Sequence, residues 1–139
     1  MARLAGATRN RPGRPAVVTG MTTGHKITIT PADAHIEVIL GGEKLAQTDR
    51  AMLLQETGLP PRYYLPTADV RMDLLLPTAS TTTCPFKGQA SYWSAQIGDD
   101  VHPDVVWSYP TPIPEAVQIA GLMCFYNDRV QLTVQPSAA

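Results

Sequence analysis

The chain has 139 residues, of which 44% are hydrophobic and 17% charged, and its formal charge at pH 7 is -1. This length suits a single globular domain with its own core. The low net charge argues against a nucleic-acid footprint over the whole surface. No apolar run approaches the ~20 residues that cross a bilayer, so we expect a cytoplasmic protein without nucleic-acid or membrane partners.

The two cysteines, Cys84 and Cys124, are too few for a disulfide framework and lack the Cys-x-x-Cys spacing of a zinc site. Reduced thiols are expected, although the sequence leaves a disulfide between the two open. We predict neither a metal nor a cofactor.

Residues 1–24 carry four arginines and no acidic residue, and they include several glycines and prolines. The composition indicates a basic extension outside the core. Three interpretations stay open: a solvated tail, an arm that binds a partner or a second subunit, and an organelle transit peptide.

From His25 onward the pattern is that of antiparallel β structure. Alternating Ile36, Val38 and Leu40, the Gly41-Gly42 pair and the returning residues 44–48 predict a hairpin. A second hairpin is predicted from residues 121–126, an Asn127-Asp128 turn and residues 129–135. Further strands are expected at residues 52–55, 62–65, 89–97 and 105–109, with a polar solvated loop at 99–104.

One short helix is predicted, with Thr67 as its N-cap, Asp69 in its first turn and Pro77 as its stop. Prolines at 110, 112 and 114 leave room for a helical turn at most over 115–118. The predicted fold is therefore a single, mainly β antiparallel domain over residues 25–135, with residues 136–139 as a tail.

The stretch from Thr83 to Trp93 combines reactive, cationic and aromatic side chains around a forced turn. Pro85 fixes its own φ and favours extended backbone at Cys84, while Gly88 permits a conformation or a close approach that a side chain would block. The strand that follows would place Tyr92 and Trp93 on opposite faces, one inside and one outside.

Several motifs together resemble those of domain-of-unknown-function family 427 over roughly residues 25 to 135. They are Tyr63-Tyr64-Leu65-Pro66, Asp69-Val70, the Cys84-Pro85-Phe86-Lys87-Gly88 turn with Tyr92-Trp93, Trp107 with Tyr109, and the segment from Gly121 to Tyr126. The resemblance implies a small fold akin to the Mss4-like β-tent, without that group's zinc-binding cysteine pairs. Family members are sometimes labelled nucleotidyltransferases, but the sequence shows neither converging carboxylates for magnesium nor a phosphate-binding loop.

Cys84 is the candidate nucleophile, since Lys87 beside it could favour a thiolate. The alternative is a small apolar side chain that fills a tight turn, and no histidine lies in the same motif. Cys124, within an apolar strand, is expected in the core.

Lys87 is the candidate anion-binding group, because the turn restricts where it points; a solvated lysine is the alternative. Tyr64, Tyr92 and Trp107 form either an aromatic wall for a ligand or part of the core. Glu56 and Asp69 are expected near the rim, paired with Arg50 or Arg62, so Arg50 and Glu56 complete the predicted ligand-binding set.

Three functional hypotheses follow. In the first, the domain binds a small, partly anionic molecule between the Cys84 to Gly88 turn and the strands of Tyr92 and Trp107. In the second, Cys84 makes the protein a thiol-dependent enzyme. In the third, the protein is an interaction module whose N-terminal arm binds a partner or a second copy of the chain, which would give a homodimer.

Overall fold

The computed structural model describes residues 25–136 and shows a mainly β chain in that range. Its strands are β1 (Ile27–Pro31), β2 (Ala34–Leu40), β3 (Glu43–Thr48), β4 (Met52–Glu56), β5 (Arg62–Tyr64), β6 (Leu75–Cys84), β7 (Gly88–Ile97), β8 (Asp100–Ser108), β9 (Met123–Phe125) and β10 (Gln131–Pro136). Three short 3-10 helices join them: η1 (Thr67–Asp69), η2 (Met72–Leu74) and η3 (Pro114–Ile119).

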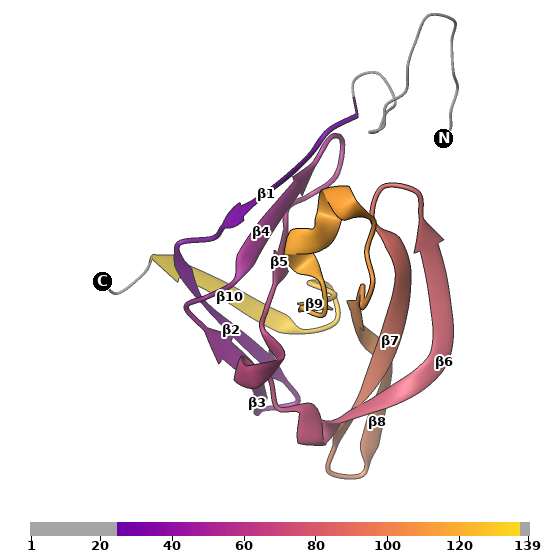
Figure 1. The fold of residues 1–139 in the computed structure, drawn as a ribbon. Helices are drawn as coiled ribbons and strands as arrows, with labels where there is room; N and C mark the ends of the chain where they lie inside the picture. Colours follow the sequence, from indigo (N-terminus) through magenta and orange to yellow (C-terminus); the bar gives the residue numbers. More distant parts are fainter. Residues whose placement is uncertain (1–24, 137–139) are drawn as a thin grey trace, which may run out of the picture.

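The strands form three antiparallel sheets with the orders β1-β4-β5, β10-β2-β3 and β6-β7-β8-β9. Leu65 and Met123 exchange two backbone hydrogen bonds of 2.8 Å, which links the end of β5 to the start of β9. The first and third sheets are thereby joined at one edge. In Figure 1 they diverge from that edge, and η3 lies between the β1-β4-β5 sheet and the β6–β7 hairpin.

The sheet of β6 to β9 is covered on both faces by separate core clusters. Val106, Met123 and Phe125 belong to the first cluster, which includes Ile36, Val38 and Leu45 of the β10-β2-β3 sheet. The alternating neighbours Trp107 and Cys124 belong to the second cluster, with Leu54 and Tyr64 of the β1-β4-β5 sheet and Ala116 and Ile119 of η3. Successive residues of a strand face opposite ways, so this sheet separates the two cores.

The first predicted hairpin is confirmed, with Gly41 at φ 60° and Gly42 at φ 80° between β2 and β3. Both residues of a two-residue hairpin turn adopt positive φ when the turn is type I′, and glycine does so at little cost. The strands predicted near residues 52–55, 62–65, 89–97 and 105–109 are also present, and η3 forms where a helical turn was expected.

The single helix predicted after Thr67 is wrong. The segment forms η1 and η2 instead, because Arg71 N donates to the carbonyl oxygen of Leu45 at 2.7 Å and Val70 bridges Ala46. These bonds tie the backbone to the edge of β3, and Leu75 already starts β6. The backbone groups of this segment that bond to β3 are therefore not available for the i→i−4 hydrogen bonds of an α-helix.

The predicted C-terminal hairpin is also wrong. β9 pairs with β8, whereas β10 pairs with β2 from Gln131↔Ile39 to Pro136↔Ala34. All three residues of β9 are buried, because their side chains pack alternately in the first and the second core cluster. A strand that is buried on both faces must have other elements packed on each face, and a hairpin at the end of the chain does not provide them.

The structure also contains strands that are not among the predicted ones. β1 was not predicted although Ile27 and Ile29 alternate with threonines, and β6 lacks alternation because most of its residues are exposed. The segment predicted as a loop at 99–104 is a strand from Asp100 onward. Tyr92 and Trp93 do face opposite ways, but both are half-buried, because each face of their sheet carries a core cluster.

In the range that the structure describes, no helix has the length and apolar character needed to cross a membrane. Residues 1–24, the predicted basic arm, lie outside the described residues.

Candidate functional site

Lys87 and Glu56 form a buried ion pair in which Lys87 Nζ lies 2.6 Å from Glu56 Oε1. Glu56 ends β4, the central strand of the first sheet, and Lys87 lies in the β6–β7 turn, so the pair joins the first sheet to the hairpin at the far edge of the third. The turn is fixed by two bonds: Lys87 N donates to Cys84 O at 3.1 Å, and Ile113 N donates to Lys87 O at 2.9 Å. The solvated lysine considered from the sequence is therefore excluded, since Lys87 is only 9% exposed.

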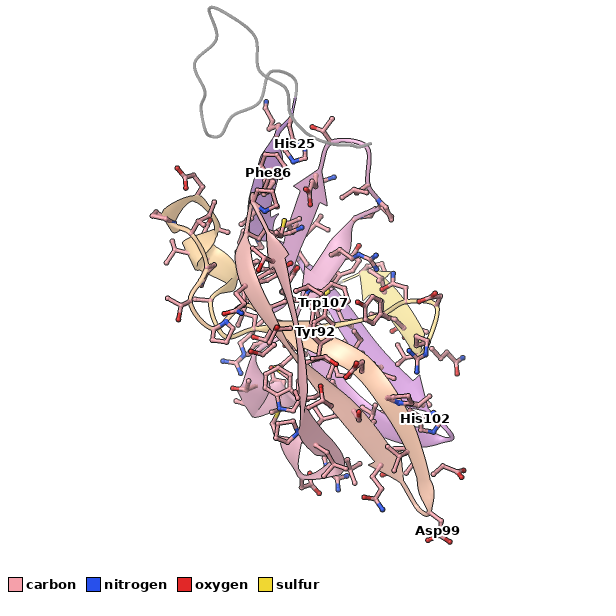
Figure 2. The ribbon with its side chains drawn as sticks, turned by 90° about the vertical axis from the view of Figure 1, so that its right-hand side faces the viewer. His25, Phe86, Tyr92, Asp99, His102 and Trp107 are labelled. Atoms are coloured by element: carbon pink, nitrogen blue, oxygen red, sulfur yellow. The ribbon has the colours of Figure 1, made fainter. Side chains whose placement is uncertain are left out.

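His25 and Phe86 close the same end of the molecule. The two rings stack with centroids 3.7 Å apart, and His25 Nε2 lies 3.0 Å from Glu56 Oε2 (Figure 2). Both carboxylate oxygens of Glu56 thus have partners. We name His25, Glu56, Phe86 and Lys87 the Lys87 cluster. Nothing in the sequence indicates this role of His25 beyond its position before the first strand.

Among the described residues, Lys87 of this cluster and the nearby Tyr109 have hydrogen-bond donors without acceptors. A lysine ammonium has three N–H donors, and within residues 25–136 only Glu56 accepts from Lys87 Nζ. The hydroxyl of Tyr109, a residue that is 6% exposed, likewise has no partner in that range. Burial, and after it the nearby Cys84, Tyr92, Cys124 and Glu56, raise the pKa of Tyr109, which therefore keeps its proton at neutral pH.

The predicted aromatic residues gather in the second core cluster, on one face of the third sheet and farther toward the middle of the molecule than His25 and Phe86. Trp107 Nε1 donates to the Tyr64 hydroxyl at 3.2 Å, and Tyr92 is the strand partner of Trp107 (Figure 2). Tyr64 is fully buried and Trp107 is nearly so, while Tyr92 is half-buried with its hydroxyl 2.8 Å from Thr82 Oγ1. Tyr64 and Trp107 therefore belong to the second core cluster, and burial raises the pKa of Tyr64.

Arg62, at the start of β5, is a site residue for which the sequence predicts only a carboxylate partner. Its guanidinium carbon lies 5.3 Å from the centroid of the Trp107 ring. Tyr126 packs on the same indole, with centroids 4.4 Å apart. No signal in the sequence would have shown this contact, because it depends on how the first sheet faces the third.

The two cysteines occupy different environments, and both are free thiols. Cys124 is buried, and burial raises its pKa to about 12, although Arg62 and Lys87 act in the opposite direction. Its predicted place in the core is confirmed. Cys84 is half-buried at the end of β6. Within the described residues no histidine hydrogen-bonds to it, and His102 lies at the far end of the molecule (Figure 2).

Arg50 belongs to another cluster. Its guanidinium nitrogens bind Asp69 at 3.1–3.3 Å, and Thr48 Oγ1 donates to the same carboxylate at 2.6 Å. The pKa of Asp69 is lowered, first by Thr48 and then by Arg50. Arg50 precedes β4 and Glu56 ends it, and six residue steps of extended chain place them about 20 Å apart. The structure thus brings Lys87 and Glu56 together but not Arg50.

A groove of about 420 Å³ lies between β3 and η1, away from the Lys87 cluster. It is lined by Glu43, Lys44, Ala46, Gln47, Ala68, Asp69, Val70 and Arg71. The charged groups here already have partners: Lys44 with Glu37, Asp69 with Arg50, and Arg71 with both Glu43 and Asp73. No residue of the Lys87 cluster lines it.

No three His, Cys, Asp or Glu side chains between residues 25 and 136 are grouped so that they could hold a metal ion. In comparisons with known proteins, a family model described as a domain of unknown function (DUF427) and labelled NTP_transf_9 matches residues 28–136. A search of curated proteins found no match.

Proposed function

Because the chain belongs to the DUF427 family, whose description names no activity, we propose a function from the site itself: the domain binds a small molecule through an anionic, acceptor-rich group at Lys87. The observation that carries this proposal is the buried ammonium of Lys87, which uses one of its three donors on Glu56 within the described residues. Buried donors in folded proteins almost always have acceptors.

The charges around Lys87 favour a ligand that is only partly anionic. Glu56 neutralises Lys87, and it also contacts His25. A carboxylate or similar group would accept hydrogen bonds from the remaining ammonium protons and from the Tyr109 hydroxyl, since charge-assisted hydrogen bonds are the stronger ones. Phe86 and Tyr92, both half-buried, would supply apolar contact, and Tyr92 packs against the core cluster of Tyr64 and Trp107.

The arrangement of the sheets also supports a binding role. The first and third sheets join at Leu65 and Met123 and are in contact again at the Lys87 cluster. We propose on this basis that the fold is a β-tent. Nucleotidyl transfer, which the family label suggests, usually uses converging carboxylates. At this site the carboxylate of Glu56 is already paired with Lys87 and His25, so binding is the function that these residues favour.

Calorimetric titration with sodium benzoate and with neutral benzamide tests the proposal, since the two probes share a ring and differ in the carboxylate. We expect benzoate alone to bind to the wild-type protein. The double variant K87M/E56Q removes both charges, so that no unpaired charge is left in the interior, and it should not bind benzoate. K26M, which changes an exposed lysine beside β1, is the matched control. Equal benzoate binding by K87M/E56Q and wild type would reject a role for Lys87.

The other two hypotheses, an interaction module and a thiol-dependent enzyme, remain predictions. A partner-binding arm or a homodimer depends on residues 1–24, which lie outside the described range. The hypothesis of a thiol-dependent enzyme depends on the reactivity of Cys84.

A further inference from the structure

Arg62 presents a half-buried guanidinium without a carboxylate partner in the part of the chain that the structure describes. The two ion-paired arginines there, Arg50 and Arg71, each contact an aspartate at 2.8–3.1 Å. The guanidinium of Arg62 instead lies over the Trp107 ring, and none of its donors has an acceptor within residues 25–136. A guanidinium has five N–H donors in a fixed planar fork.

The strand register shows that Arg62 faces the site. Arg62 is paired with Leu54 across β4 and β5, and directly opposite residues of an antiparallel pair share a face. Leu54 is buried in the second core cluster, so Arg62 projects to the side of the first sheet that faces the third. Glu56, two residues beyond Leu54, projects to the same side.

The surroundings of Arg62 hold it in one orientation. The Trp107 ring is fixed by its bond to Tyr64 and by Tyr126, and the cation lies over that ring. A cation on an aromatic face leaves the edge of the guanidinium free for hydrogen bonds. Arg62 and Lys87 both lower the pKa of the Cys124 thiol, against the larger effect of burial, which is consistent with two cations on the same side of the second core cluster.

We propose that Arg62 is an oxyanion-binding residue, which holds a carboxylate or a phosphate of a small ligand through two parallel N–H···O bonds. Bidentate binding of such planar groups is what the guanidinium fork provides. The subsite deepens the proposed function, since a ligand with two anionic groups would use both Lys87 and Arg62, but the two residues can be tested separately.

The chain carries its own reporter for the test. Of its two tryptophans, Trp93 packs against the first core cluster and Trp107 contacts Arg62. In a W93F background the emission of Trp107 can be followed while sodium phosphate or sodium acetate replaces sodium chloride at constant ionic strength. We expect a saturable change with at least one of the two oxyanions, and the comparison between them distinguishes a phosphate ligand from a carboxylate ligand.

Variants at Arg62 decide the inference. R62K keeps a cation over Trp107 and so preserves the fold, but it loses the fork, and R62Q loses the charge as well. Each should weaken oxyanion binding by about tenfold or more, whereas R50K, the same exchange at an arginine bound to Asp69, should not change it. Equal binding by wild type, R62K and R62Q, or a change in emission that never saturates, would overturn the subsite.

The double variant K87M/E56Q separates this inference from the proposed function. Oxyanion binding that is lost in R62K and retained in K87M/E56Q supports an independent Arg62 subsite. Loss in both variants supports one ligand position that uses both cations. Loss in K87M/E56Q alone overturns the role of Arg62 and leaves the proposed role of Lys87 in place.

Discussion

The backbone of Gly88 packs directly against Pro112, so that a β-carbon at Gly88 would lie 3.1 Å from the Pro112 α-carbon. Gly88 also has a φ of +122°, which side-chain-bearing residues rarely adopt. The contact fixes the β6–β7 turn against the segment before η3, where Ile113 N binds Lys87 O. The position of Lys87 therefore depends on the residue that follows it.

We expect G88A to lower the free energy of unfolding by about 2–4 kcal/mol, since it adds backbone strain and a steric overlap. Chemical denaturation measures the change. G98A is the control, because Gly98 has a φ of +61° and open space around it, so that strain alone should cost about 1–2 kcal/mol. Equal losses in G88A and G98A would mean that the Pro112 contact relaxes without cost.

The Glu56–Lys87 pair predicts a large coupling energy. K87M and E56Q should each destabilise the protein by about 3–5 kcal/mol, because each leaves a polar or charged partner buried without its counterpart, and K87M/E56Q should recover much of this loss. A double-mutant cycle measured by denaturation gives the coupling. The exposed pair Lys44–Glu37, with 3.5 Å between Nζ and Oε1, should show less than about 1 kcal/mol. Additive effects of K87M and E56Q would contradict the ion pair.

The sequence sufficed for features that are set within a few residues. The Gly41-Gly42 hairpin and the turn around Pro85 and Gly88 follow from the backbone preferences of glycine and proline, and both are present. The alternation in residues 89–97 likewise predicted β7. In each case the signal and the structure that it specifies lie next to each other in the chain.

The features that the sequence did not predict depend on contacts between distant segments. Glu56 and Lys87 are 31 residues apart, and their pairing requires that the first sheet face the third. The partner of β10 is β2, at the other end of the described chain, so the apparent C-terminal hairpin carried no information about it. Arg62 was considered for salt bridges, yet its contact is the face of Trp107, which strand periodicity cannot indicate.

His35 should make stability depend on pH. Hydrogen bonds with Asp49 at 2.8 Å and with Glu37 at 3.1 Å raise its pKa above 6.5. A group with a raised folded-state pKa stabilises the protein fully below its unfolded value, and this contribution is lost as pH rises through the folded value. The difference in Tm between wild type and H35Q should therefore be larger at about pH 5.5 than at about pH 8.5. H102Q is the control, and a difference for H35Q that does not change with pH would contradict the prediction.

The reactivity of Cys84 tests the enzyme hypothesis. With iodoacetamide on the native protein we expect one modified thiol, Cys84, because Cys124 is buried and its pKa is raised to about 12. Peptide mass mapping identifies the site, and C84S should show no reaction. The rate should not exceed that of glutathione, since the Lys87 ammonium contacts Glu56 while His25 and His35 contact carboxylates. A rate about tenfold or more above glutathione would instead show an activated thiolate, and the thiol-dependent enzyme would then replace the binding protein as the better hypothesis.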